Sequence, residues 1–272
     1  MSCKKIAIFS VLLFSLMQVS GPANAADASL FQASVPVADQ SAAARDEALR
    51  NALEVVLVRV TGNPLVASSS AAASLLDNAA HYAGSYHYEQ RIPASVQTQA
   101  QVGELAAEPE PVLHLSASFD PAALERAVRQ AGLPYWGERP ETLVWLAVEE
   151  GRQLVGDANT GIAAKAHDAL LQAARARGIT LIFPLLDTQD RQLVSYTDVW
   201  AGFNDRVLAA SERYGTDTVL VGKLYQTGNG WQAQWQLLDD TGSATSQWQS
   251  LSGPLASVMA GGINPLADAY AA

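Results

Sequence analysis

The feature that most constrains this fold is a regular alternation of strand-like and helix-like segments in the second half of the chain. It begins with ETLVWLAVEE, a nearly continuous apolar stretch of strand length. Strands of six to nine residues that alternate with helices are typical of parallel pairing through crossover connections. We therefore predict an α/β layer built from strand 141–150, helix 160–177, strand 179–187, helix 201–214 and strand 216–226.

Beyond residue 226 the pattern changes to that of antiparallel hairpins. TGNG at 227–230 and DDTGSA at 239–244 are turn signals between short segments that alternate apolar and polar residues. A final helix is predicted over residues 255–271. Together these segments predict a C-terminal α/β domain, residues 139–272, whose mixed sheet ends in antiparallel hairpins.

The first half of the chain predicts an N-terminal α+β domain over residues 26–134. Apolar residues recur at helical spacing before Gly62 and Pro64, which are ordinary helix terminators. Residues 93–111 are polar, acidic and bracketed by prolines, and they predict a mobile insert. The candidate elements have the order β-α-α-β-β-α and are strand 30–38, helix 42–60, helix 70–82, strand 85–92, strand 112–119 and helix 121–131.

The amino terminus has the features of a secretory signal peptide. Lys4 and Lys5 precede the apolar run IAIFSVLLFSLM, and a small-x-small cleavage site follows. We expect residues 1–25 to be removed at a site formed by Ala23, Ala25 and Ala26. The apolar run is too short to span a bilayer comfortably, and no second candidate follows. We therefore expect a periplasmic protein without an integral membrane segment.

Cysteine content and charge exclude several kinds of chemistry and partner. The single cysteine, Cys3, lies before the expected cleavage site, so the mature chain has neither disulfides nor thiolate metal sites. Removal of Lys4 and Lys5 leaves 15 basic residues against 27 acidic ones. Nucleic acids and anionic lipids bind largely through basic clusters, so both are poor partners for this chain.

Two short motifs resemble catalytic or cofactor loops but lack essential parts. Leu237–Ser243 contains Asp-Thr-Gly, the loop of aspartic proteases, which need two such carboxylates; this chain has one copy. We interpret it as a hairpin turn. Residues 156–165 have the glycine spacing of a phosphate-binding loop, but Ile162 and Ala163 replace the required Lys and Ser/Thr. Asn159 or Thr160 as a helix cap explains the same residues.

Other polar groups also fall short of a catalytic or metal constellation. His81, His87 and Glu89 are too few for a zinc site, and no histidine follows the neighbouring Ser195 and Asp198. We therefore predict no catalytic residue, no metal and no cofactor. A hydrolase would have to use the clustered carboxylates, which are Asp187, Asp190, Asp239 and Asp240.

Residues 230–238, GWQAQWQLL, alternate strictly between apolar residues and glutamine. A strand would place Trp231, Ala233, Trp235 and Leu237 on one face, which we interpret as core rather than a ligand platform. The opposite, solvated face is a candidate interaction surface and consists of Gln232, Gln234 and Gln236. The joint at 132–140 adds Tyr135 and Trp136, which pack between the domains or, if exposed, form a docking patch.

Three sequence blocks resemble the DUF2066 family of exported Gram-negative proteins, which has no assigned activity. The blocks are VPVADQSAAARDEALRNALEVVLVRVTGN, FDPAALERAVRQAGLPYWGERP and LVWLAVEEGRQLV. The family implies no catalytic residues. Separately, TDTVLVGKLYQ and WQAQWQLLDDTGSATSQW are similar in layout to the amino-terminal module of TolB. That similarity implies a protein-interaction role.

These observations favour a non-enzymatic periplasmic protein that binds another component of the cell envelope. Its candidate surfaces are the edge of the first sheet, residues 93–111 and the glutamine face. Two alternatives stay open. One is a hydrolase that uses the clustered aspartates, and the other is a solute-binding protein with a cleft between its two halves.

Overall fold

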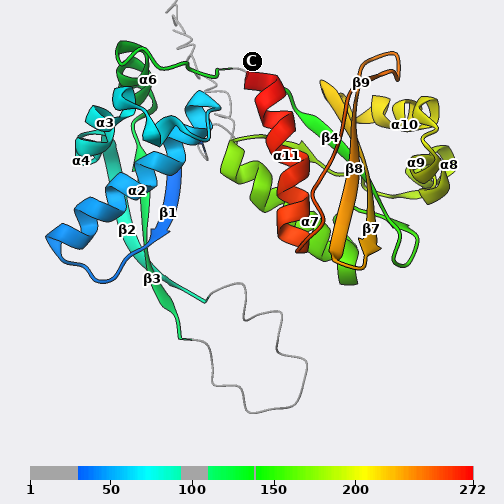
Figure 1. The fold of residues 1–272 in the computed structure, drawn as a ribbon, viewed down its shortest axis with the longest axis horizontal. Helices are drawn as coiled ribbons and strands as arrows, with labels where there is room; N and C mark the ends of the chain where they lie inside the picture. Colours follow the sequence, from blue (N-terminus) through cyan, green and yellow to red (C-terminus); the bar gives the residue numbers. More distant parts are fainter. Residues whose placement is uncertain (1–29, 93–109, 138, 272) are drawn as a thin grey trace, which may run out of the picture.

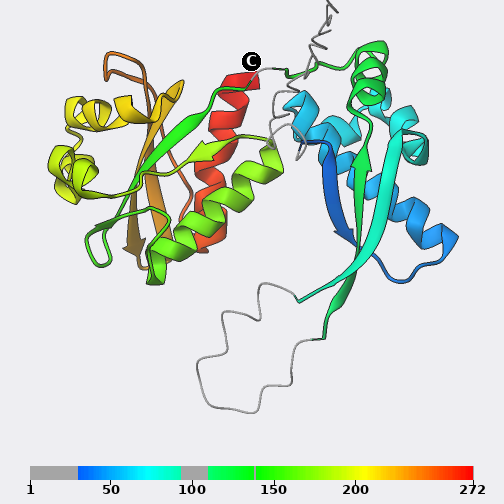
Figure 2. The same ribbon diagram turned by 180° about the vertical axis from the view of Figure 1, so that it is seen from behind.

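The computed structural model describes residues 30–92, 110–137 and 139–271. Within these ranges the chain forms two sheets with separate helical layers, seen side by side in Figures 1 and 2. The predicted α+β class, with a mixed sheet and antiparallel hairpins, is confirmed. No helix in the described part of the chain is long and apolar enough to cross a membrane. The predicted signal peptide and nearly all of the 93–111 insert lie outside the described residues.

The N-terminal part is a three-stranded antiparallel sheet in the order β1-β3-β2, with helices on one face. Strict alternation along β3 buries Leu115, Ala117 and Phe119 against those helices. The elements are β1 (Gln32–Pro36), α2 (Ala42–Thr61), η1 (Val66–Ser68), α3 (Ser70–Asp77), α4 (Ala79–Tyr82), β2 (Ala83–Arg91), β3 (Val112–Phe119) and α6 (Pro121–Gln130).

Helix α2 begins and ends where local chemistry predicts. Ser41 Oγ accepts a hydrogen bond from the Ala44 N–H at 3.2 Å, which satisfies one free donor of the first turn. Gly62 adopts φ 70°, a left-handed conformation that costs glycine little, and it ends the helix. The apolar stripe between these caps is buried against the sheet, so the helix is held by tertiary packing.

The C-terminal part is a mixed sheet in the order β5-β4-β7-β8-β9, with β6 also paired to β4. Strand β4 runs parallel to β6 and β7, while β7, β8 and β9 form antiparallel hairpins. The elements are β4 (Thr142–Val148), β5 (Gln153–Leu154), α7 (Gly161–Arg177), β6 (Leu181–Ile182), α8 (Thr188–Leu193), α9 (Tyr196–Ala201), α10 (Asn204–Ser211), η2 (Glu212–Tyr214), β7 (Thr218–Thr227), β8 (Gly230–Leu238), β9 (Ala244–Gln249) and α11 (Leu255–Ala271).

Helices cover both faces of this sheet, which explains the continuous apolar run of β4. Val144, Leu146 and Val148 pack toward α7 and α11, whereas Leu143 and Trp145 pack toward α9 and α10. A strand buried on both faces has no solvated side and therefore does not alternate. All seven residues of β4 are buried.

The tryptophan face of β8 is core, as predicted. Ala233, Trp235 and Leu237 are buried beneath α7 and α11, and Trp248 pairs with Trp235 across the hairpin. The Trp235 Nε1–H donates to Ser250 Oγ at 2.9 Å, so its one polar atom is satisfied inside the core.

Three predicted elements differ from the structure. The strand expected at 179–187 is reduced to β6, because Pro184 cannot donate to a sheet ladder and Asp187 caps α8. The helix expected at 201–214 begins only at Asn204, since Gly202 at φ 83° ends the preceding helix α9, and its last residues form the 3-10 helix η2. The helix expected at 70–82 is interrupted at Asn78.

The two parts meet where α2 and α7 end. Tyr135 packs with the N-terminal core, whereas the next residue, Trp136, packs with the C-terminal core and is 8% exposed. The Trp136 N–H donates to Val60 O at 2.7 Å. Arg177, almost fully buried, donates to Gly62 O at 3.0 Å and to Asp268 Oδ1 at 2.6 Å. The junction is therefore closed by packing, hydrogen bonds and an ion pair.

Candidate functional site: the groove between the two sheets

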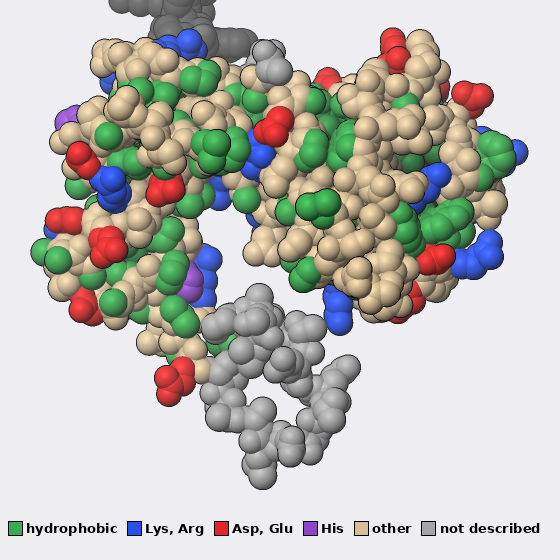
Figure 3. Space-filling model, in the orientation of Figure 1, with side chains coloured by type: hydrophobic (Ala, Val, Ile, Leu, Met, Phe, Trp, Pro, Cys, Tyr) green, Lys and Arg blue, Asp and Glu red, His purple; other side chains and the backbone are tan. Residues whose placement is uncertain are grey.

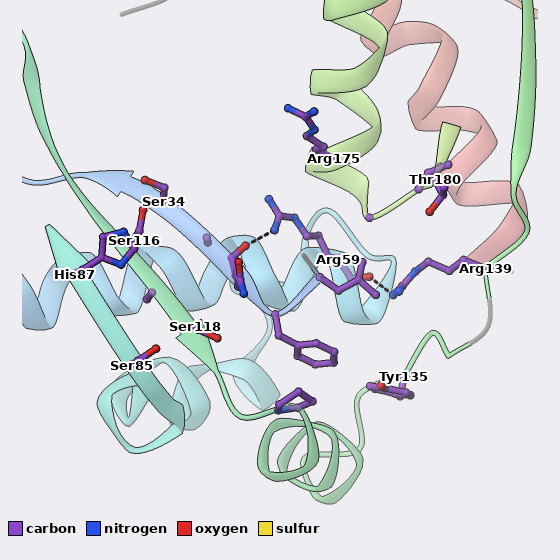
Figure 4. A pocket seen from close by; sticks show the side chains of 18 of the residues that line it. Ser34, Arg59, Ser85, His87, Ser116, Ser118, Tyr135, Arg139, Arg175 and Thr180 are labelled. Carbon is purple, nitrogen blue, oxygen red and sulfur yellow. Dashed lines mark hydrogen bonds between the residues drawn. The ribbon is translucent and has the colours of Figure 1, made fainter. Parts of the chain in front are cut away.

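A groove of about 1440 Å³ separates the uncovered face of the N-terminal sheet from the end of α7. Figure 3 shows the hollow between the two parts, with Lys and Arg side chains around it. Figure 4 labels ten of its lining residues, which come from β1, β2, β3, the end of α2, the joint and the end of α7: Ser34, Arg59, Ser85, His87, Ser116, Ser118, Tyr135, Arg139, Arg175 and Thr180.

The floor of the groove is a sheet face that no described helix covers. The alternation that turns Leu115 and Ala117 toward the helices turns Ser116 and Ser118 the other way. Cross-strand pairing places Ser34, Ser116 and His87 in one row across the three strands. The floor is therefore lined by hydroxyl groups and one imidazole, all able to form hydrogen bonds.

Arginines dominate the charge of the groove. Among the described residues, its lining contains four arginines, Arg59, Arg91, Arg139 and Arg175, against two glutamates, although the chain as a whole has a net charge of −10. The groove is therefore a positive region of an acidic protein. Such a region attracts anionic groups and raises their local concentration.

Two of these arginines are fixed at the base of the groove. Arg59 Nη1 donates to Gln32 O at 2.6 Å, and Arg139 Nη2 donates to Arg59 O at 2.8 Å and to Trp136 O at 2.9 Å. Arg139 also stacks over the Trp136 ring at 4.7 Å. Burial lowers the pKa of Arg59, whose guanidinium nevertheless stays charged. An anion bound here would offset part of this desolvation.

Arg175 differs because it extends into the groove from the last turn of α7. Its side chain is exposed and forms no ion pair with any residue that the structure describes. A cation in a last turn also interacts favourably with the helix dipole, which alone would account for an arginine at this position. Its place in the groove adds an accessible guanidinium opposite the serine-lined sheet.

Glu89 lies at the edge of the serine row and does not form a catalytic triad. It accepts hydrogen bonds from Ser116 and, at 3.3 Å, from Ser34, and it pairs with Arg91. The bond from Ser116, followed by that from Arg91, lowers the pKa of Glu89 to about 2. Since Ser116 donates to this carboxylate, its proton does not point to His87, as nucleophilic activation would require.

The aspartates expected of a hydrolase have structural roles. Asp187 caps α8 and forms a two-point pair with Arg213 at 2.9 and 3.0 Å, and the bond from Arg213 is the main reason its pKa falls to about 2. The fully buried Asp190 accepts from Tyr214 Oη at 2.6 Å. Asp239 accepts from the N–H groups of Thr241 and Ser243 within the β8–β9 turn. Asp240 is exposed.

The other short motifs are also local structure. Ser195 and Asp198 form a capping box at the start of α9. Asn159 Oδ1 accepts from the Gly156 N–H before α7, while Thr160 occupies the N-cap position without a side-chain bond, so the predicted capping bond is not formed. Among the described residues, no three His, Cys, Asp or Glu side chains are placed to hold a metal ion.

The predicted interaction residues fall in two places. Tyr135 is half-buried and lines the groove, but burial of Trp136 removes it as an exposed docking residue. Gln234 is exposed and Gln232 and Gln236 are half-buried on the outer face of β8, where a depression of about 280 Å³ lies. Strand β8 lies on the other side of α7 and α11 from β1 (Figure 1). The cleavage residues Ala23, Ala25 and Ala26 lie outside the described residues.

The sequence interpretation did not identify the groove arginines. Arg59, Arg139 and Arg175 are far apart in the chain and converge only because α2, the joint and α7 meet. One local signal was present in the sequence of β3: the residues between its apolar positions are His114, Ser116 and Ser118, all of them polar. That pattern indicates a polar face but not what it faces.

Comparisons with known proteins identify one matching family model. It describes a domain of unknown function, DUF8605, and matches residues 25–137. It is not the DUF2066 family that the sequence blocks resemble, so only the coarser expectation of an uncharacterised domain is confirmed. No curated protein matches the chain.

One of the two solved chains that match shows limited likeness to this chain. It is the C-terminal domain of LpoB from Salmonella enterica, which is 20% identical, with a TM-score of 0.29. The match covers 43% of this chain and 86% of that one. A TM-score this low does not indicate a shared fold.

Proposed function

We propose that this protein is an exported, non-enzymatic binding protein of the cell envelope, and that it holds an anionic partner in the groove between its two sheets. The observation that carries the proposal is the concentration of arginines along the groove of an acidic chain. Guanidinium groups bind carboxylates and phosphates through two parallel hydrogen bonds, which gives both strength and orientation.

The size of the groove favours an extended partner. Pockets for small molecules usually enclose about 300–1,000 Å³, whereas this groove measures about 1440 Å³. Its floor is a polar sheet face rather than an apolar cavity. A solute-binding protein remains the second candidate, because the groove lies between two separately packed cores.

The proposed location rests on the sequence. A charged start, an apolar run and a small-x-small site precede Ala26. The resemblance of the C-terminal half to the TolB module supports an envelope partner. Mass spectrometry of the protein from a periplasmic fraction tests this: a chain that begins at Ala26 is expected, and retention of residues 1–25 would contradict export.

Binding of a labelled oligoglutamate peptide, measured by fluorescence anisotropy, tests the groove. We expect Arg175→Glu to weaken binding about tenfold, through loss of one charge-assisted contact and introduction of a like charge. Arg191→Glu makes the same charge change at an exposed site on α8 outside the groove and should bind like the wild type. Equal weakening by both variants would indicate a general charge effect and would contradict the proposal.

A further inference from the structure

Strand β1 is an edge of the N-terminal sheet, and it borders the groove. Among the residues that the structure describes, the strand order β1-β3-β2 leaves one side of β1 without a neighbouring strand. Residues 30–34 line the groove, and both ribbon views place β1 on the side of its sheet nearer α7. A free strand edge thus lies beside the arginines.

The register shows which backbone groups face that free edge. The Phe119 N–H donates to Phe31 O and the Val37 N–H to Leu113 O, both at 2.9 Å. Because antiparallel bonding alternates along a strand, residues 31, 33, 35 and 37 bond to β3 and residues 32, 34 and 36 point outward.

Two further details agree with this assignment. Pro36, which has no N–H to donate, occupies an outward position, as prolines in edge strands do. Gln32 O, also outward, is the acceptor for Arg59 Nη1. In the described part of the chain, the Gln32 N–H and both backbone groups of Ser34 have no hydrogen-bond partner.

An unpaired edge is a template for another strand. Side chains of an added strand would alternate between the two faces of the sheet. Those on the open face would lie in the groove beside Ser34, with Arg59 at one end and Arg175 across from it. Acidic side chains at every second position match this arrangement of charge.

We propose that the partner in the groove is an extended polypeptide with acidic residues at alternate positions, which pairs with β1 as a fourth strand. This inference rests on the proposed function and specifies its partner. Main-chain hydrogen bonds to residues 32–34 hold the segment in register, while the arginines select its charge. Pro36 ends the available edge, so the paired stretch is short.

Short synthetic peptides of alternating threonine and glutamate provide the probe, with binding to the mature chain measured by fluorescence anisotropy. In an extended peptide the N–H groups of successive residues point to opposite edges, so all threonine N–H groups lie on one edge and all glutamate N–H groups on the other. Two isomers, one N-methylated at every threonine and the other at every glutamate, therefore each block hydrogen bonding along one edge. We expect one isomer to bind about tenfold more weakly, from loss of one or two hydrogen bonds, and the other to bind normally. Equal binding, or equal loss, of both isomers would overturn strand addition.

Variants of Ser34 test the same contact from the protein side. Ser34→Pro removes the outward N–H without breaking a bond to β3, whereas Ser34→Ala removes only the hydroxyl. We expect Ser34→Pro to weaken binding about tenfold and Ser34→Ala to retain it. Equal affinities of the two folded variants would contradict the pairing. If Ser34→Pro does not fold, the peptide isomers decide.

The outcomes separate this inference from the proposed function. If both isomers bind alike while Arg175→Glu weakens every acidic peptide, the groove binds anions without strand pairing, and this inference fails alone. If the glutamate peptide binds no better than its threonine–glutamine analogue, anion binding by the groove is itself contradicted, and both proposals fail.

Discussion

At the scale of single residues, Trp235 shows how neighbours set the place of a large side chain. Its ring lies against Gly222 and Gly262, where an added Cβ would come within 2.6 and 2.4 Å of ring atoms. Ser250 Oγ accepts from the indole and donates to Val258 O at 2.7 Å. The two glycines therefore provide the space and Ser250 satisfies the polar atom.

Gly262→Ala should destabilise the protein. Alanine favours a helix over glycine by about 1 kcal/mol, but overpacking a core typically costs about 1–3 kcal/mol, and the added methyl would meet a rigid ring on a central strand. We expect a net loss of up to about 2 kcal/mol in the free energy of unfolding, measured by urea denaturation. Gly228→Ala is the control, because nothing lies within 4 Å of its added Cβ. A Gly262→Ala protein as stable as this control would contradict the packing argument.

At the scale of elements, α9 depends on its capping box. Ser195 Oγ accepts from the Asp198 N–H and donates to the Asp198 carboxylate, which also accepts from the Ser195 N–H at 2.8 Å. The bond from the Ser195 hydroxyl is the main reason the pKa of Asp198 lies below its usual range. Six residues form a marginal helix, so the cap and the burial of Val199 hold it in place.

Ser195→Ala should cost about 1 kcal/mol of stability, the usual effect of removing a helix cap. Ser195→Thr keeps a hydroxyl at this position and should retain most of that stability. Urea denaturation of the two variants compares them directly. An equal loss in both would show that the hydroxyl is not what stabilises the start of α9.

At the scale of the whole molecule, the width of the groove depends on the junction between the two parts. Arg177 links three segments there, because it bonds Gly62 at the end of α2 and both Asn264 and Asp268 on α11. Its guanidinium is buried, whereas Arg175, two residues earlier, extends into the groove. Neighbouring arginines on one helix thus have different roles.

Arg177→Ala should lower the free energy of unfolding by about 2–3 kcal/mol, since it removes charge-assisted bonds and leaves a buried carbonyl unsatisfied. Arg175→Ala, exposed on the same turn, should change stability by less than about 0.5 kcal/mol. Calorimetry of both variants provides the comparison. Similar melting of the two would show that the junction does not depend on Arg177.

Local sequence determined most elements of this protein. Ser41 and Gly62 delimit α2, alternation defines β3 and β8, and glycine-containing turns define the hairpins. Helix caps, apolar periodicity and turns depend on residues only a few positions apart, so the sequence shows them directly. The same reasoning overestimated the strand at 179–187, because Pro184 has no N–H for a sheet ladder and Asp187 already caps α8.

Tertiary structure alone decided the candidate site. The serines of β1 and β3 form an open floor only because every described helix of the N-terminal part packs on the opposite face. The arginines converge only because α2 and α7 end at the same junction. Burial of Trp136 likewise depends on contacts with residues far away in the chain. Sequence determined the elements because their causes are local, whereas the groove arises from how distant surfaces pack together.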